Sequence, residues 1–133
     1  MPPSSVLIVE DDRSIRETMK MILELNGYSV YTAGDGREAL TILKSIRPSL
    51  ILLDLMMPLM NGWQFLNELK KLDQTSSVPV VIVSAAGNAV AASQELGKEL
   101  LLKPLKLETF LQVVKRYSER DQAHRESLER KYG

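Results

Sequence analysis

The sequence predicts an α/β fold in which helices cover both faces of a parallel, five-stranded sheet. Short β-branched or leucine-rich runs recur along the 133 residues, and segments with helical spacing of apolar residues lie between them. The runs cover residues 6–9, 28–33, 50–53, 80–83 and 100–102. Strands that alternate with helices in this way are joined by right-handed crossovers, so we expect the strands to be parallel.

The segments between the runs have the apolar period of helices. Apolar side chains recur three or four residues apart within residues 15–23, 39–46, 65–72 and 107–117. Asn26-Gly27 follows the first stripe as a helix stop signal, and the second stripe halts before Pro48. The remaining connection, 87–97, carries mostly alanines, so its helix is expected to be short and loosely packed.

The polarity of the runs predicts the order of the strands. Runs 6–9, 50–53 and 80–83 are almost wholly apolar, as expected when both faces of a sheet are covered. The run "YSVYTA" at 28–33 mixes in polar residues and is expected at an edge. Together these features fit a doubly wound, flavodoxin-like (βα)5 fold with strand order 2-1-3-4-5.

Composition limits the classes of function. Seventeen basic and seventeen acidic side chains cancel, so no global positive field favours nucleic acid. Cysteine is absent, which excludes disulfides and thiolate chemistry. The start, "MPPSSVLIVEDD", lacks the basic region of a signal peptide, and no apolar stretch has the length of a membrane span. We therefore expect a cytoplasmic protein that contacts neither nucleic acid nor membrane.

Acidic residues follow two of the central strands. Glu10, Asp11 and Asp12 come directly after the first run, and Asp54 closes the third. In a sheet of this order, ligands bind beyond the carboxyl ends of the strands where the order reverses, here between the first and third. Crowded carboxylates repel one another unless a cation neutralises them. Magnesium, which takes oxygen ligands and is often bound by one or two carboxylates with a phosphate, is the expected ion.

Two further polar residues belong to the same edge of the sheet. Ser84 ends the fourth strand with a hydroxyl, and Lys103 ends the fifth with an ammonium. A carboxylate nucleophile such as Asp54, with a metal, a hydroxyl and a lysine around it, indicates a site for phosphoryl transfer.

Four motifs in order resemble the receiver domain of bacterial two-component response regulators: "VLIVEDD", "ILLDLMMPLMNG", "VVIVSA" and "LLLKP". The resemblance spans roughly residues 4–117, which we expect to form the receiver domain. Residues 118–133 are expected to be a charged extension of the last helix, supported by acid-before-base pairs such as Asp121 with Arg125.

The resemblance implies a switch rather than an enzyme with an external substrate. Asp54 would accept a phosphoryl group from a histidine kinase or a histidine phosphotransfer protein. Ser84 would then hydrogen-bond a phosphate oxygen, and Lys103 would form a salt bridge to the phosphoryl group. The family's Lys-Pro bond, here Lys103-Pro104, is typically cis.

The resemblance also implies a set of magnesium ligands. Asp11 and Asp54 would bind the ion, Glu10 would act mostly through water, and the backbone carbonyl of Met56 would supply another oxygen. Asp12 could belong to this acidic group or could cap the first helix by accepting from backbone N–H groups, and the cap is the favoured role.

Two departures from the family pattern leave an alternative open. Leu100 stands where receivers usually have an aromatic residue, and the stretch 84–103 is about three residues short. A pseudo-receiver, a phosphorylation-independent interaction module, is therefore the alternative function. A phosphohydrolase of the haloacid dehalogenase type is disfavoured because Met56 replaces its second aspartate. Because Met56 and Ala86 offer no group that would activate water, we expect slow loss of the phosphoryl group.

Overall fold

The computed structural model describes residues 4–57, 59–72, 75–85, 87 and 89–132. It contains one parallel sheet, in the order β2-β1-β3-β4-β5. The strands are β1 Ser5–Val9, β2 Ser29–Ala33, β3 Leu50–Leu53, β4 Val80–Ser84 and β5 Glu99–Leu102. The predicted order and the edge position of the second strand are thus confirmed.

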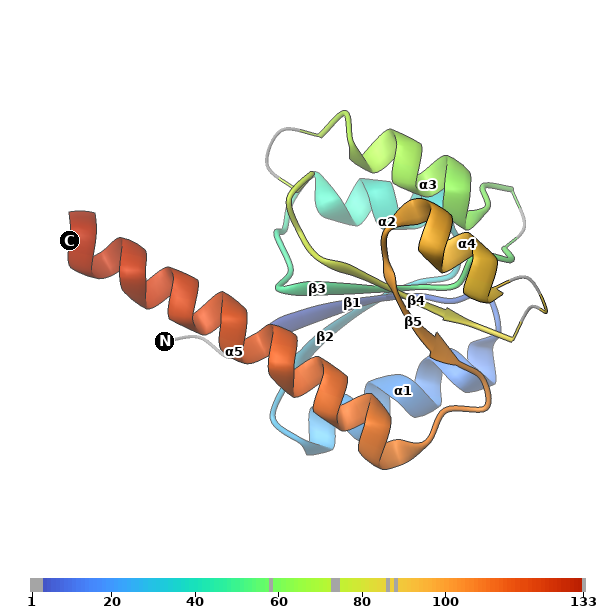
Figure 1. The fold of residues 1–133 in the computed structure, drawn as a ribbon, viewed down its shortest axis with the longest axis horizontal. Helices are drawn as coiled ribbons and strands as arrows, with labels where there is room; N and C mark the ends of the chain where they lie inside the picture. The colour runs from blue at the N-terminus through green and yellow to red at the C-terminus, as the bar shows by residue number, and fades with distance from the viewer. Residues whose placement is uncertain (1–3, 58, 73–74, 86, 88, 133) are drawn as a thin grey trace.

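Five helices follow the five strands. They are α1 Arg13–Leu25, α2 Gly36–Leu43, α3 Gly62–Leu69, α4 Ala89–Leu96 and α5 Leu107–Tyr132. Helices α1 and α5 cover one face of the sheet, and α2, α3 and α4 lie on the other side (Figure 1). The fourth helix is short, as its alanine-rich sequence predicts.

Alternation along the central strands divides the core between these two layers. Leu7 and Val9 of β1 pack with residues of α2 and α3, whereas Val6 and Ile8 pack with residues of α1 and α5. Since successive side chains of a strand point to opposite faces, a strand covered on both sides must be apolar throughout. All four residues of β3 and all five of β4 are buried. A smaller cluster of Leu55, Ile82 and Ala92 joins α4 to the sheet, and Leu100 packs against it.

Side-chain caps fix where the helices near the carboxyl edge of the sheet begin. The carboxylate of Asp12 accepts a hydrogen bond from the Ile15 amide at 3.0 Å, so its predicted role as the cap of α1 is confirmed. Asp35 caps α2 in the same way, and Asn61 forms a reciprocal capping box with Gln64 at the start of α3. Such caps stabilise a helix by about 1 kcal/mol each.

Helix α5 continues without a break to Tyr132 and projects beyond the sheet (Figure 1). Its middle is attached to the body: the Ser49 hydroxyl donates to Asp121 Oδ2 at 2.8 Å, and the Ser118 hydroxyl donates to the Ser4 hydroxyl at 2.7 Å. The expected pair of Asp121 with Arg125 is formed at 3.0 Å. The domain boundary at residue 117 stays a prediction. No helix in the described part of the chain combines the length and apolarity that a membrane span requires.

Candidate functional site

The carboxyl ends of β1 and β3 bring the acidic residues together. The two strands pair in parallel register, with Val9 opposite Leu53, so the residues that follow each strand emerge side by side. The Asp54 amide donates to the Val9 carbonyl at 3.0 Å, and the Glu10 amide donates to the Ala33 carbonyl at 3.0 Å. Ladder hydrogen bonds therefore fix the backbone on which the acids stand.

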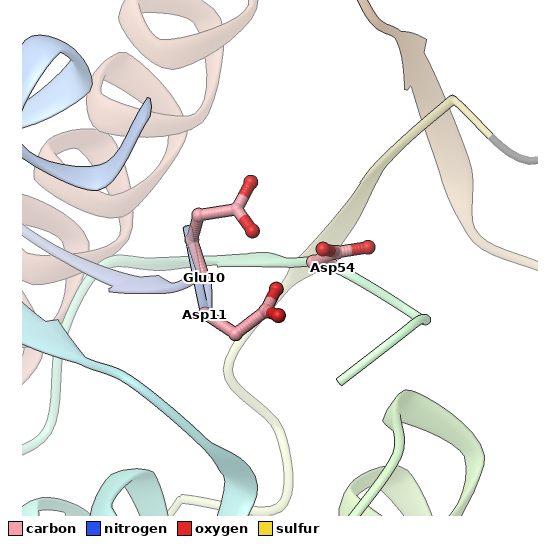
Figure 2. Close-up of side chains that lie close together, drawn as sticks. All are labelled: Glu10, Asp11 and Asp54. Atoms are coloured by element: carbon pink, nitrogen blue, oxygen red, sulfur yellow. The ribbon is translucent and has the colours of Figure 1, made fainter. Parts of the chain in front are cut away.

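The carboxylates of Glu10, Asp11 and Asp54 form a single cluster. One oxygen from each lies within 4.8 Å of the others, and the three side chains are oriented toward a common point (Figure 2). Glu10 is 2% exposed and Asp54 6%, whereas Asp11 is exposed. The cluster is thus a pair of buried acids with one acid at the solvent boundary.

Lys103 brings the end of β5 into this cluster. Its Nζ forms an ion pair with Glu10 Oε1 and lies 3.4 Å from Asp54 Oδ2. The Lys103 amide donates to the Ser84 carbonyl at 3.0 Å, which ties the ends of β4 and β5 together. Ser84 itself is buried at the end of β4, and the Lys103-Pro104 bond is cis.

Burial and crowding control the charges at the site. Burial, together with the neighbouring Asp54 carboxylate, raises the pKa of Glu10 from 4.5 to about 7 despite the opposing contact with Lys103. Burial alone would lower the pKa of Lys103, but its contacts with Glu10 and Asp54 outweigh burial and raise it. One ammonium therefore does not fully compensate the carboxylates, and an added cation would be favoured.

The donor set suits a hard divalent ion. All three side chains offer oxygen, which magnesium and calcium prefer, and the described residues gather no histidine or cysteine with them. Glu10, Asp11 and Asp54 are therefore the residues that could hold a metal. The Met56 amide donates to Asp54 Oδ1 at 3.0 Å, which orients the Asp54 carboxylate. The role of the Met56 carbonyl as a ligand stays a prediction.

The structure brings together most of the residues that the sequence singles out. Glu10, Asp11, Asp54 and Lys103 meet, and Ser84 stands at the same edge of the sheet. Their chemical roles stay predictions. Ala86, which was expected beside the path of a hydrolytic water, lies outside the described residues.

Sequence reasoning missed Arg16, whose guanidinium contacts the acidic loop from α1. Arg16 Nη1 donates to the Glu10 carbonyl at 2.8 Å. The sequence pattern does not predict such a contact, because an arginine in the first turns of an amphipathic helix is expected on its solvent-exposed face. Only the tertiary structure reveals it.

Comparison with known proteins shows the family to which these features belong. Residues 6–115 match the model of the response regulator receiver domain. The chain is 37% identical over 112 residues to the response regulator MprA of Mycolicibacterium vanbaalenii, a match that covers 82% of this chain and 48% of that protein. It is 40% identical over 95 residues to the probable transcriptional regulator ycf27 of Cyanophora paradoxa, covering 71% and 38% respectively. The chain thus spans about half the length of the curated relatives it matches.

Solved structures agree on the fold. The chemotaxis protein CheY4 of Vibrio cholerae is 31% identical with a TM-score of 0.78, covering 86% of this chain and 98% of that one. The signal receiver domain of a histidine kinase from Syntrophus aciditrophicus is 34% identical with a TM-score of 0.78, covering 87% and 90% respectively. A chemotaxis protein and the receiver domain of a histidine kinase therefore share this architecture.

Proposed function

Because the chain belongs to the response regulator receiver domain family of two-component systems, we propose that Asp54 is its phosphoacceptor and that phosphorylation switches its affinity for a partner protein. The observation that carries this function is the convergence of Glu10, Asp11 and Lys103 on the carboxylate of Asp54. The donor is a phosphohistidine of a histidine kinase or of a histidine phosphotransfer protein. Such a switch would work in the cytoplasm without contacting nucleic acid or membrane itself.

The proposed reaction is a transfer of one phosphoryl group. An oxygen of the Asp54 carboxylate bonds to phosphorus while the phosphorus–nitrogen bond of the donor breaks. The imidazole leaves with the electron pair of that bond and takes a proton from water. The product is an acyl phosphate on Asp54.

The surrounding residues position and neutralise the transferring group. The hydrogen bond from the Met56 amide holds one oxygen of Asp54 and leaves the other toward Lys103. Lys103, which lies within reach of Asp54, would pair with the phosphoryl oxygens, and Ser84 would donate its hydroxyl to one of them. Magnesium held by Glu10, Asp11 and Asp54 would neutralise the charge that accumulates there.

An apolar groove beside the site supports docking of a helical partner. A cavity of about 350 Å³ runs between α1 and the beginning of α5, with Lys103 in its lining. Ile15, Met19, Pro104 and Phe110 supply much of its apolar surface. A partner helix that buries its apolar face there would bring a phosphohistidine to the carboxyl edge of the sheet.

The domain would catalyse only its own phosphorylation and a slow hydrolysis of the product. Met56 is exposed and apolar, so it offers no base or acid to orient water near Asp54. We therefore expect a long-lived phosphoryl form when no phosphatase partner is present.

Intact-protein mass spectrometry tests the function directly. The chain is incubated with magnesium and a small phosphodonor such as acetyl phosphate, and a gain of one phosphoryl group is expected. Asp54→Asn should abolish the gain, and chelation of magnesium should suppress it. Asp12→Asn is the matched control, because it removes an acid from the same loop while asparagine keeps the cap of α1. An unmodified wild-type chain would instead support the pseudo-receiver alternative.

A further inference from the structure

Arg16 of α1 lies behind the acidic loop and holds its backbone. Its Nη1 donates to the Glu10 carbonyl at 2.8 Å and reaches the Asp11 carbonyl at 3.5 Å. These carbonyls belong to two of the three residues whose carboxylates converge at the site. Hydrogen bonds from a charged donor are stronger than neutral ones, so this contact restrains the loop more than a solvated side chain would.

The guanidinium also lies beside Gly34, the residue that follows β2. A Cβ built on Gly34 would lie 3.5 Å from Arg16 Nη1 and 3.6 Å from Glu38 Oε2, so both side chains pack against this glycine. Glu38 Oε2 accepts from the Gly34 amide at 2.9 Å and thereby fixes the β2–α2 turn. Arg16 is half-buried between the two loops.

We propose, on the premise of the function proposed above, that Arg16 is a positioning residue for magnesium: it acts through the carbonyls of Glu10 and Asp11 to hold their carboxylates in place for the ion. Arg16 does not touch the ion or the phosphoryl group. Loss of its restraint would let the loop relax and would weaken magnesium binding. Partners of this outer kind typically change metal affinity by about 10- to 100-fold.

The direction in which the magnesium affinity changes on substitution of Arg16 distinguishes a positioning role from simple charge repulsion. A cation close to a magnesium site repels the ion, so removing its charge alone should tighten binding. Removal of a positioning contact should weaken binding instead. Arg13 provides the matched control, since it stands one turn earlier on α1, is exposed, and its side chain has no hydrogen bond or ion pair with any described residue.

The experiment is a magnesium titration of the full chain for wild type, Arg16→Met, Arg16→Lys and Arg13→Met. Binding is followed by calorimetry and by the fluorescence of Trp63, the single tryptophan of the chain, which is the second residue of α3. We expect Arg16→Met to bind magnesium about tenfold more weakly. Arg16→Lys keeps the charge but loses the planar guanidinium, so its magnesium affinity should fall between those of wild type and Arg16→Met. Arg13→Met should bind as wild type or slightly tighter. The free energy of unfolding without magnesium is measured alongside to confirm that each variant is folded.

A second readout is the rate of phosphorylation from acetyl phosphate as a function of magnesium. For Arg16→Met, the rate should be low at limiting magnesium and return to the wild-type value at saturation, a split that general damage to the fold would not produce. Wild-type affinity in Arg16→Met and Arg16→Lys, or equal weakening in Arg13→Met, would overturn the positioning role and leave the proposed function intact. A wild-type chain that binds no magnesium would overturn both.

Discussion

Replacing Gly62 with alanine is expected to destabilise the protein, although alanine is the better helix former. Gly62 is the first residue of α3, and its amide donates to the Leu55 carbonyl at 2.9 Å. A Cβ at Gly62 would lie 2.6 Å from Leu55 Cδ2, 2.7 Å from Leu55 Cα and 3.2 Å from the Asp54 carbonyl. Leu55 Cα is backbone held close to β3, so the clash cannot be relieved by a change of rotamer.

The size of three energy terms decides whether Gly62→Ala stabilises or destabilises the protein. Alanine gains at most about 1 kcal/mol over glycine in a helix. Forcing an atom into a well-packed contact costs about 1–3 kcal/mol. Lengthening the hydrogen bond between Gly62 and Leu55 costs roughly another 1 kcal/mol. The net expectation is therefore a loss of about 1–3 kcal/mol in the free energy of unfolding.

Urea unfolding measures this loss, and two other glycines calibrate it. Gly36 is likewise the first residue of its helix, but the atoms within 3 Å of its added Cβ are Cγ and Sδ of Met60, a flexible side chain. Gly36→Ala should therefore change the free energy by less than about 1 kcal/mol. Nothing lies within 4 Å of a Cβ at Gly87, so Gly87→Ala should fall within about 0.5 kcal/mol of wild type. Equal effects at Gly62 and Gly36 would refute the steric reasoning.

Three further outcomes follow from the polar contacts. In magnesium-free buffer, the free energy of unfolding should fall as the pH rises from about 4.5 to about 7. Within this window the raised pKa of Glu10 keeps a proton on the folded chain that the unfolded chain has already released. Urea titrations across the window measure the fall. Lys103→Met should destabilise the magnesium-free protein by about 2–3 kcal/mol above neutral pH, and by less in acid, where Glu10 becomes neutral. Added magnesium should restore part of the lost stability in the same titrations. Asp121→Ala should lower the free energy of unfolding, measured with heat or urea, by about 1–3 kcal/mol, because it leaves the buried Ser49 hydroxyl without its acceptor. The control Glu126→Ala on the same helix should change the free energy of unfolding by less than about 0.5 kcal/mol.

Each of these outcomes has a clear opposite. A pH profile that is flat for wild type and equally flat for Glu10→Gln would show that Glu10 is ionised in the folded chain throughout the window. Lys103→Met with the same loss at acid and neutral pH would show that packing, not charge, sets its contribution. Equal effects of Asp121→Ala and Glu126→Ala would show that the attachment of α5 at Ser49 adds no stability.

Much of the site followed from local patterns because topology gathers the ends of parallel strands. Asp54 was placed correctly from an apolar run that stops at a carboxylate, and Lys103 from its position after the fifth run. The rule that ligands collect where the strand order reverses then brought Glu10 and Asp11 to the same point. Asp12 was left with two possible roles, and its hydrogen bond with the Ile15 amide confirms the favoured one, the cap of α1.

The sequence by itself determined the order of the strands, the buried and edge positions, and the set of acids that meet, because hydrophobic period and crossover handedness leave few arrangements open. Only the tertiary structure decided which charged groups of distant segments are in contact. The ion pair of Lys103 with Glu10, the support of the acidic loop by Arg16, and the attachment of Asp121 to Ser49 each join segments distant along the chain or depend on a particular rotamer. Sequence periodicity carries no information about such distances, which are set by how the layers pack.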